Sequence, residues 1–445
     1  MSVRPKIAIF NLNMTHRDPR VLRISATLRA RGPVVAVFEM QQNDMPAQEV
    51  INGVTIYRVP VPQSYTDADM AEFGRVCPAA AQVISEASSE VYSCRVRCRG
   101  SAFRRTFDRL PFRLRRPPRA KLSQTEQSNS EDVASIRSIM LVNLAIFRAA
   151  ERYRADIIHC NDLDTLLAGY IFQRKYGTKI IFDAHEIYPE QLPESMRSQI
   201  WYDFYTNLEK RLINEADGRL TVCDSLGRYF ASRYNTGGFV TIRNLPSRTQ
   251  LPDRKIVSSR IKEPLRFLYH GSYSRYRGLD EIIQASCFMD GAEFVFRGIG
   301  SYVQVLKRLS IELGVDDRVT FADPVGVAEL VSSAAECDVG LNPFIPVCKN
   351  TEYALPNKFF EYLMAGLACA SSNLIEIREH TMRYDIGILF EKLEPEAIAG
   401  QLQDLVDNPD RVAHYRANAL KAAHEELHWE NEEKKFAAFY QQFLE

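Results

Sequence analysis

The chain has 445 residues, of which 46% are hydrophobic and 25% are charged, so it is long enough for two or three globular domains. Its 56 basic and 56 acidic residues give a formal net charge of +0, and no nucleic-acid-binding motif is present, so we expect no nucleic-acid partner. No run of about 18 apolar residues predicts a membrane-spanning helix, and the four-residue apolar run after Lys6 is too short for a signal peptide. The nine scattered cysteines lack zinc-ligand spacing, which favours reduced thiols.

The first sixty residues alternate between strand-like and helix-like segments. Apolar runs predict strands at residues 6–10, 34–38 and 54–59, and helical apolar spacing predicts a helix at residues 20–31. The turn signal Asn52-Gly53 precedes the third strand. Strands that alternate with helices imply a parallel, doubly wound α/β sheet.

Residues 63–135 break this alternation and predict a surface insertion. Between residues 95 and 121 there are eleven basic residues and one acidic residue, Asp108, with phenylalanine and leucine residues interleaved. This composition suits an anionic membrane surface, and a solvated basic loop is the alternative. The polar residues 123–131 predict a loop.

The alternation resumes after residue 135. Helices are predicted at residues 136–152 and 165–176, and strands at residues 155–160, 179–183, 219–223 and 239–244. A polar stretch at residues 246–264 predicts a linker. A second series of strands follows at residues 265–270, 292–297, 318–321, 338–344 and 367–371. Two such series predict two Rossmann-like domains facing a cleft, with ligands at the carboxyl ends of the strands.

Residues 355–366 combine helix signals with charged residues that helix packing does not require. Pro356 at the start and Gly366 at the end bracket a short amphipathic helix. Lys358 at the helix N-terminus can hold an anion, and Glu361 one turn further can accept hydrogen bonds from sugar hydroxyls. The combination suggests a nucleotide-sugar site, although Lys358 could also be a surface cation.

Further motifs lie at the ends of predicted strands or in adjoining loops. They are DPRVLR at residues 18–23, DAHEIYPE at 183–190, YHGSYSRYRGLD at 269–280, FVFRGIG at 294–300 and LHWE at 427–430. In this order they resemble the motifs of GT-B fold retaining glycosyltransferases of glycosyltransferase family 4 (glycosyl transferases group 1). The resemblance covers the chain except for about residues 63–135.

The resemblance implies a domain organisation and a set of residues on the acceptor side. An N-terminal acceptor domain is expected at residues 1–250, a C-terminal donor domain at 251–424, and a terminal helix at 425–445 that crosses back to the N-terminal domain. His185, just past a strand end, is expected to act as a catalytic residue that hydrogen-bonds the reacting sugar or the acceptor, with a structural turn histidine as the alternative. The expected acceptor-binding residues are Asp18, Arg20 and Asp162, and helix capping is the alternative for Asp162.

The resemblance also implies a donor site in the second domain. Arg277 is expected to contact the diphosphate and Glu361 the ribose hydroxyls, and both are expected to be catalytic. The other expected donor-binding residues are Gly271, Arg275, Gly298, Tyr353, Asn357 and Lys358. Members of the family often carry a basic residue where this chain has Ser272, and a first glutamate where it has Tyr353.

The implied reaction moves a sugar, with retention and without a metal, from a UDP- or GDP-sugar to a hydroxyl of a glycan or lipid-linked acceptor. Such a reaction fits bacterial surface polysaccharide or glycolipid assembly. We expect no cofactor, and a cytoplasmic protein that contacts the inner face of the membrane peripherally, with an anionic membrane surface as a further partner. Two alternatives stay open: a catalytically silent GT-B-like binding subunit and a nucleotide-sugar epimerase.

Overall fold

A computed structural model describes residues 4–15, 18–41, 45–60, 124–252, 261 and 263–444. The chain divides into two compact units. Unit 1 consists of Met1–Thr15, Arg29–Arg219 and Tyr234–Gly237, and unit 2 consists of His16–Leu28, Leu220–Arg233 and Gly238–Glu445. Most of the insertion expected at residues 63–135, with its interpretation as a membrane contact, lies outside the described residues. The domain boundaries expected at residues 250 and 424 stay predictions.

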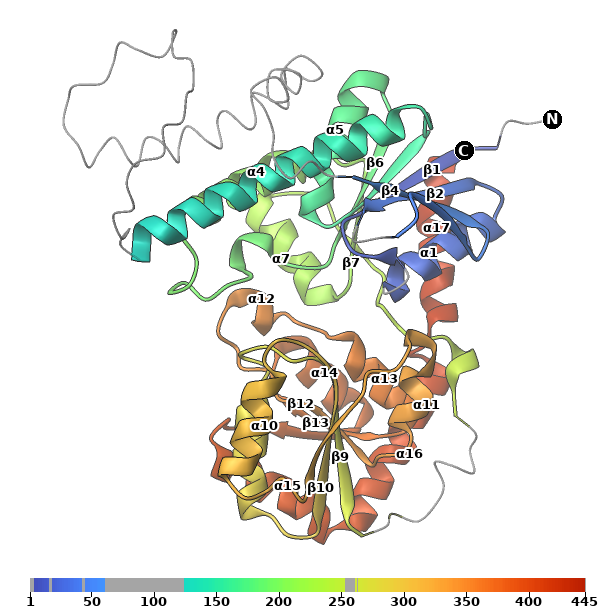
Figure 1. The fold of residues 1–445 in the computed structure, drawn as a ribbon. Helices are drawn as coiled ribbons and strands as arrows, with labels where there is room; N and C mark the ends of the chain where they lie inside the picture. Colours follow the sequence, from blue (N-terminus) through green and yellow to red (C-terminus); the bar gives the residue numbers. More distant parts are fainter. Residues whose placement is uncertain are drawn as a thin grey trace. The chain divides into compact units, whose positions relative to one another are not determined.

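An eight-stranded sheet has the strand order β3-β4-β2-β1-β5-β6-β7-β8. Its strands β1, β2, β4, β6 and β7 are labelled in Figure 1. Its strands are β1 (Lys6–Asn11), β2 (Val34–Met40), β3 (Gln48–Ile51), β4 (Val54–Val59), β5 (Ile157–Asn161), β6 (Lys179–Ala184), β7 (Gly218–Thr221) and β8 (Val240–Thr241). The pairs β1–β2, β1–β5, β2–β4, β5–β6 and β7–β8 are parallel, as predicted. The unpredicted edge strand β3 forms an antiparallel hairpin with β4, and its turn is Asn52-Gly53, with φ of 51° and 77°.

The helices that precede β9 in the sequence follow the predicted alternation, with one correction. They are α1 (Pro19–Ala30), α4 (Gln124–Glu151), α5 (Leu163–Tyr176), α6 (Gln199–Leu212) and α7 (Asp224–Tyr234), with 3-10 turns η2 (Tyr188–Glu190) and η3 (Arg248–Gln250). The prediction of a loop at residues 123–131 is wrong, because α4 already begins at Gln124. The polar composition suggested a loop, but no glycine or proline between residues 124 and 135 stops the helix. The strand predicted at residues 239–244 is shortened to β8.

Unit 2 contains a second, six-stranded sheet in the order β11-β10-β9-β12-β13-β14, with parallel pairing throughout. Its strands are β9 (Leu265–Ser272), β10 (Ala292–Ile299), β11 (Val319–Ala322), β12 (Val339–Asn342), β13 (Ala368–Ser372) and β14 (Gly387–Phe390). Its helices are α9 (Leu279–Ala285), η4 (Ser286–Phe288), α10 (Val303–Glu312), η5 (Val327–Glu329), α11 (Leu330–Ala334), α12 (Lys349–Glu352), α13 (Asn357–Ala365), α14 (Ile375–Tyr384), α15 (Pro395–Asp407), α16 (Pro409–Glu425) and α17 (Trp429–Leu444). The predicted pair of parallel-sheet domains is therefore confirmed.

Both faces of this second sheet are buried. Successive side chains of a strand point to opposite faces, and each face of the sheet is covered by its own set of helices. In β9, Phe267 and Tyr269 join the core formed with α9, α10 and α15, whereas Leu268 joins the core formed with α11, α13, α14 and α16. The predicted apolar pairs of α13, Phe359 with Leu363 and Phe360 with Met364, are all buried in the second of these cores. The packing of α13 against the sheet fixes where its polar residues lie.

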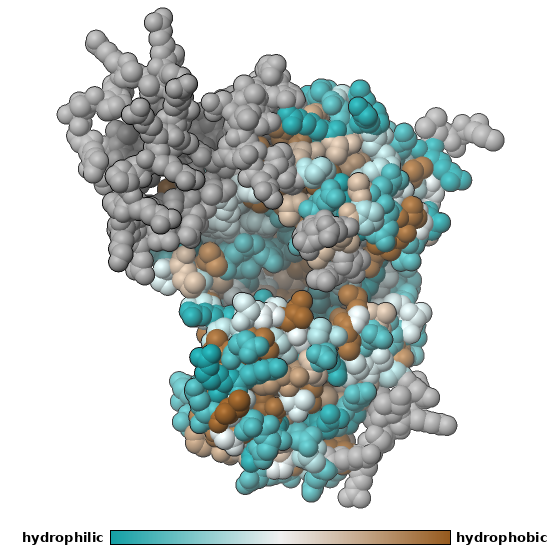
Figure 2. Space-filling view, viewed as in Figure 1, coloured by the Kyte–Doolittle hydropathy of each residue, from teal (hydrophilic) through white to brown (hydrophobic). Residues whose placement is uncertain are grey.

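On the visible face of unit 2, hydrophobic residues are interspersed among hydrophilic ones (Figure 2). Exposed large hydrophobic side chains include Ile311 and Met382, which lie on the separate helices α10 and α14. Among the helices that the structure describes, none has the length and apolar character needed to cross a membrane.

Two glycines of unit 2 share a left-handed backbone but differ in their surroundings. Gly278, before α9, has a φ of 71°, and a Cβ atom there would lie 1.7 Å from the carbonyl oxygen of Pro343. Gly314, after α10, has a φ of 67°, and no atom lies within 4 Å of the place of a Cβ. Only the first position therefore requires glycine for close packing as well as for its backbone conformation.

We expect Gly278→Ala to destabilise unit 2 by about 3 kcal/mol or more, because it adds a backbone clash to the cost of a left-handed alanine. Gly314→Ala is the matched control and should cost about 1–2 kcal/mol, from backbone strain alone. Urea unfolding of the full chain, followed by circular dichroism, measures both changes. Equal shifts of the unfolding midpoint in the two variants would contradict the close contact between Gly278 and Pro343.

Candidate functional site

The ammonium group of Lys358 lies among aromatic rings at the amino end of α13. Its Nζ is 3.6 Å from the ring centroid of Tyr269 and 5.2 Å from that of Phe344. The residue is only 9% exposed, and burial, reinforced by the positive charge of Arg277, holds the pKa of Lys358 well below its usual value against the opposing effect of Glu361. A Cβ atom on Gly271 would lie 3.0 Å from Nζ, so glycine at this position leaves room for the ammonium group.

Arg277 brings a second positive charge to the same aromatic ring. Its Cζ is 4.7 Å from the centroid of Phe344, and its Nε donates a hydrogen bond of 3.3 Å to Ser274 Oγ. Phe344 follows β12, and Lys358 opens α13, so both cations gather beside the carboxyl ends of the parallel strands. Among the described residues, neither cation forms an ion pair with a carboxylate. The first-turn amides of α13 add donors that a helix cannot satisfy internally, so this region favours an anion.

Glu361 faces His270 at the end of β9. Glu361 Oε2 lies 2.8 Å from His270 Nε2, at ion-pair distance but without the alignment of a hydrogen bond, and the two side chains are 13% and 3% exposed. The Tyr362 hydroxyl accepts a hydrogen bond of 3.0 Å from the His270 amide and donates one of 3.3 Å to the Leu341 carbonyl. The helix that carries Glu361 is thereby fixed to β9 and β12. Sequence reasoning missed His270, although a histidine directly before Gly271 at a strand end was a usable signal.

The other expected donor-binding residues have different surroundings. Arg275 and Asn357 are exposed. Gly298 of β10 pairs with Gly271 of β9, and a Cβ atom on Gly298 would lie 1.8 Å from the Gly271 carbonyl oxygen. The two glycines therefore allow the strands to approach closely at their carboxyl ends.

Tyr353 packs against α7. Its ring centroid lies 5.2 Å from that of Tyr229, and its carbonyl oxygen accepts a hydrogen bond of 3.7 Å from the Cys223 thiol. The neighbouring Glu352 is exposed on α12. The aromatic ring that stands where the family often has a glutamate is thus engaged in packing, and its expected contact with the donor stays a prediction.

Asp18 and Arg20, expected to bind the acceptor, both have partners in the protein. Asp18 Oδ1 accepts hydrogen bonds from the Arg20 and Val21 amides at the start of α1. Arg20 is 2% exposed and donates a hydrogen bond of 2.5 Å to the Ile242 carbonyl. Arg23, which the sequence analysis did not select, donates to Asn244 Oδ1 at 2.6 Å. Burial lowers the pKa of Arg23 to about 10, although the nearby Glu361 opposes this shift, so Arg23 and Glu361 interact electrostatically.

In unit 1, the His185 ring lies between two carboxylates at the ends of β5 and β6. Its Nδ1 is 3.1 Å from Asp162 Oδ2, and its Nε2 is 3.3 Å from Asp183 Oδ1. The backbone amide of His185 also donates a hydrogen bond of 2.8 Å to Asp162 Oδ1. Burial opposes the charged ring, but the two carboxylates outweigh it and raise the pKa of His185 to about 10. The structure therefore brings together His185 and Asp162, both selected from the sequence.

Asp162 has a strained backbone conformation, with φ of 60° and ψ of 171°. Its amide donates a hydrogen bond of 2.9 Å to the Asp183 carbonyl, and its own carbonyl accepts one of 3.3 Å from the Thr165 amide. Its side chain makes no capping hydrogen bond to α5, so the helix-capping alternative for the carboxylate is wrong. Instead, this carboxylate is directed to His185.

Asp164 adds a third carboxyl group near this cluster. Burial, together with the negative charge of Asp162, raises the pKa of Asp164 to about 8, although a hydrogen bond with Tyr188 opposes the shift. Asp164 is therefore mostly protonated at pH 7. In the part of the chain that the structure describes, no three histidine, cysteine, aspartate or glutamate side chains are grouped in a way that could hold a metal ion.

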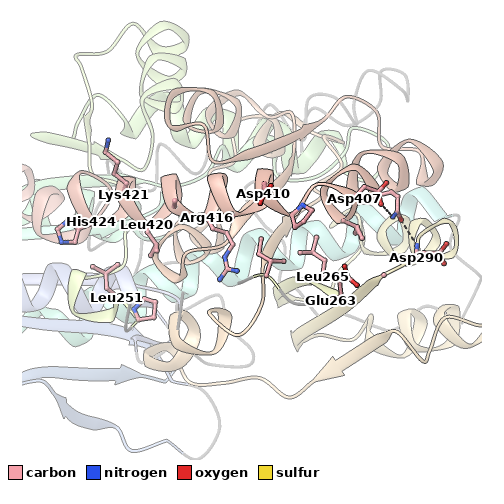
Figure 3. Close-up of a pocket in the computed structure, with 18 of the residues that line it drawn as sticks. Leu251, Glu263, Leu265, Asp290, Asp407, Asp410, Arg416, Leu420, Lys421 and His424 are labelled. Atoms are coloured by element: carbon pink, nitrogen blue, oxygen red, sulfur yellow. Dashed lines mark hydrogen bonds between the residues drawn. The ribbon is translucent and has the colours of Figure 1, made fainter. Parts of the chain in front are cut away.

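A cavity of about 1310 Å³ lies elsewhere in unit 2, along α16 (Figure 3). Its lining includes Leu265, the first residue of β9, and Gly291, which precedes β10. It therefore lies at the amino ends of these strands, whereas parallel sheets bind ligands at the carboxyl ends. Its most buried cation, Arg416, is already paired with Asp338 at 2.8 Å and donates to the Gly366 carbonyl at 3.0 Å. We therefore assign the candidate site to the strand ends despite the size of this cavity.

Comparison with known proteins agrees with this geometry. The family model for Glycosyltransferase Family 4 matches residues 95–244, and that for Glycosyl transferases group 1 matches residues 264–408. A curated relative, the GDP-mannose-dependent alpha-(1-6)-phosphatidylinositol monomannoside mannosyltransferase of Mycobacterium tuberculosis, is 25% identical over 156 residues, which are 34% of this chain and 40% of the relative. The chain thus spans less than half of the length of this relative.

Two solved structures show the likeness in fold. Sucrose-phosphate synthase from Thermosynechococcus elongatus superimposes with a TM-score of 0.71 at 15% identity, covering 99% of both chains. Alr3699/HepE of Anabaena, in complex with UDP-glucose, superimposes with a TM-score of 0.65 at 12% identity, covering 98% of this chain and 99% of that chain. These likenesses show the GT-B fold, and the two matched family models show that the chain belongs to the glycosyl transferases group 1 family.

Proposed function

We propose that the protein is a retaining, metal-independent glycosyltransferase that moves a sugar from a UDP- or GDP-sugar to a hydroxyl of a glycan or lipid-linked acceptor. The observation that carries the proposal is the pair of cations, Lys358 and Arg277, that share the Phe344 ring. A nucleoside diphosphate would compensate both charges at once. Surface polysaccharide or glycolipid assembly is the pathway we propose for the product.

The two cations also suit the chemistry of the reaction. Negative charge grows on the diphosphate as the sugar leaves, and preorganised positive charge in a water-poor site stabilises that change. Lys358 and Arg277 would supply this charge from side chains, which is why we propose transfer without a divalent metal. Glu361 would accept hydrogen bonds from the ribose hydroxyls, with His270 holding its carboxylate in place.

Nucleotide-sugar chemistry among similar proteins supports the donor class. The mycobacterial relative is GDP-mannose-dependent by name, and the Anabaena structure contains UDP-glucose. For the acceptor side, we propose that Asp162 and His185 serve the hydroxyl that attacks the sugar. We propose retention because the chain resembles a retaining family.

The test of the proposed function is a donor panel. The protein is incubated with UDP- and GDP-sugars, with and without glycan and lipid-linked acceptors, in the presence of a chelator, and free UDP or GDP is measured. Acceptor-dependent nucleotide release, with a product whose anomeric configuration by NMR matches that of the donor, supports the proposal. Epimer formation or tight binding without turnover would overturn glycosyl transfer. An inverted product would overturn retention, and loss of activity with the chelator would overturn metal independence.

We expect Glu361→Gln to weaken UDP binding about 10- to 100-fold, because it removes a charged hydrogen-bond acceptor for the ribose. Isothermal titration calorimetry with UDP measures the dissociation constant. Glu352→Gln, which changes an exposed glutamate on the neighbouring helix α12, is the matched control and should leave the affinity unchanged. Equal affinities of the Glu361→Gln variant and the unaltered protein would refute the ribose assignment.

Lys358 should couple UDP binding to proton uptake. Its pKa is lowered in the free protein, and a bound diphosphate would raise it again. Above the free-state pKa, binding therefore takes up a proton, and affinity declines as the pH rises. Titrations of UDP across the alkaline range, in HEPES and in Tris, measure the uptake from the difference in apparent enthalpy.

The Lys358→Met variant should bind UDP more weakly and lose the proton uptake, since methionine keeps most of the side-chain volume without the charge. Lys349→Met, on α12, removes a lysine whose Nζ lies 5.8 Å from the Tyr229 ring centroid, and it should retain the uptake. Identical enthalpies in the two buffers for the unaltered protein would show that Lys358 does not change its protonation on binding.

A further inference from the structure

The surroundings of His185 leave its ring little freedom to exchange a proton with a substrate. Both ring nitrogens face carboxylates, Asp162 at 3.1 Å and Asp183 at 3.3 Å. Nε2 lies at ion-pair distance from Asp183 without the alignment of a hydrogen bond, but two carboxylates within 3.3 Å of one ring favour its positive charge. The geometry on its own therefore favours the doubly protonated ring.

Asp183 is the more deeply buried of the two carboxylates beside His185. Its carboxylate is fully buried, and its second oxygen lies 3.3 Å from Nε2 of His159, which is also fully buried. His159 Nε2 in turn lies 3.2 Å from Asn161 Oδ1. The Asp183 carboxylate thus faces two histidines, and a positive charge on His185 favours the burial of this carboxylate as an anion.

The remaining titratable neighbours adjust the balance of charge. Asp164, Glu186 and Tyr188 are the other groups that interact electrostatically with this cluster. Asp164 is mostly protonated at neutral pH, so it adds little negative charge, and Glu186 is exposed, so water screens its effect. The core of the cluster therefore consists of the His185 ring and the two carboxyl groups of Asp162 and Asp183 beside it.

Asp162 is the carboxylate of the cluster that a ligand can reach. Its side chain is 15% exposed, whereas that of Asp183 is 0% exposed. Each carboxylate oxygen has lone pairs beyond the one directed at His185. The strained backbone of Asp162 is held by hydrogen bonds from two neighbouring segments, and strain of this kind concentrates at functional sites.

We infer that His185 is a positioning residue, held by Asp162 and Asp183 as a permanent imidazolium, and that Asp162 is the group that accepts the hydrogen bond of the attacking hydroxyl. This inference rests on the proposed function for the identity of the ligand, but not for the charge of the ring. The imidazolium fixes the orientation of the Asp162 carboxylate. During transfer the bond from the anomeric carbon to the diphosphate breaks, the bond to the acceptor oxygen forms, and the hydroxyl proton passes to Asp162. His185 therefore neither gains nor loses a proton.

The charge of the ring can be tested without any enzymatic activity. Two-dimensional NMR of the full chain, labelled with ¹⁵N in histidine, reports the protonation of each of the eight imidazoles, and a His185→Gln variant identifies the signals of His185. We expect the His185 signals to keep the pattern of a doubly protonated ring from pH 6 to about 8.5. Titration of His185 with a midpoint near 6.5 in the unaltered protein would overturn the inference.

Asp183→Asn then separates a positioning role from a merely structural one. Loss of one carboxylate lowers the pKa of His185, so the ring should begin to deprotonate within the range from pH 6 to 9. Transfer by this variant should fall about tenfold or more between pH 7 and 9, relative to the unaltered protein, because the deprotonated ring no longer orients Asp162. Its KM for the donor should not change.

His159→Gln is the matched control, because it removes the other partner of Asp183 and leaves both carboxylates beside His185. It should lower activity, if at all, by the same factor at every pH. A pH-independent loss in Asp183→Asn would reduce Asp183 to a structural residue, and activity that increases with pH would make His185 a general base. If no donor or acceptor supports transfer, the proposed function fails while the NMR result still decides the charge of the ring.

Discussion

The burial of the Lys358 ammonium group is the constraint on which the candidate donor site depends. Removing a cation from water is costly, and a neighbouring arginine increases that cost, whereas Glu361 and the rings of Tyr269 and Phe344 offset only part of it. The fold tolerates this arrangement because α13 is held rigidly: its apolar face is buried, and the Tyr362 hydroxyl joins it to β9 and β12. The buried charge of Lys358 thus lowers the stability of the free protein, and an anionic ligand that compensates this charge would restore that stability.

The parts of this site that the sequence predicts are those with local signals. Pro356 and Gly366 bracket α13 because their backbone preferences act within one or two residues, and Gly366 does adopt the left-handed conformation, with φ of 76°. Glu361 was noticeable as a carboxylate in an apolar helix. Apolar runs likewise predict most of the parallel strands, since strands buried on both faces are rich in apolar residues, although β14 was not predicted and the strand predicted at residues 239–244 is shortened to β8.

The parts that the sequence does not predict depend on contacts between distant segments. The amide of His270 meets the hydroxyl of Tyr362, 92 residues away in the chain, only because β9 and β12 are neighbours in the sheet. The same holds for Phe344: its sequence context is that of an ordinary apolar residue, and only the fold places Arg277 and Lys358 beside its ring. The pairing of His185 with Asp162 is another such contact, because nothing in the sequence near residue 185 shows that Asp162 lies beside it.

The two clusters solve the problem of buried charge in opposite ways. In unit 1, carboxylates on both sides face the imidazolium of His185, so this ring needs no further anion from a ligand. In unit 2, Lys358 and Arg277 lie close together and form no ion pair among the described residues, so that cluster lacks an anion. This difference matches what each half of a glycosyl transfer requires. The leaving diphosphate carries charge that must be met by charge, whereas the attacking hydroxyl is neutral and needs only a well-oriented acceptor. A histidine that already lies between two carboxylates can provide that orientation without depending on the pH of the solvent.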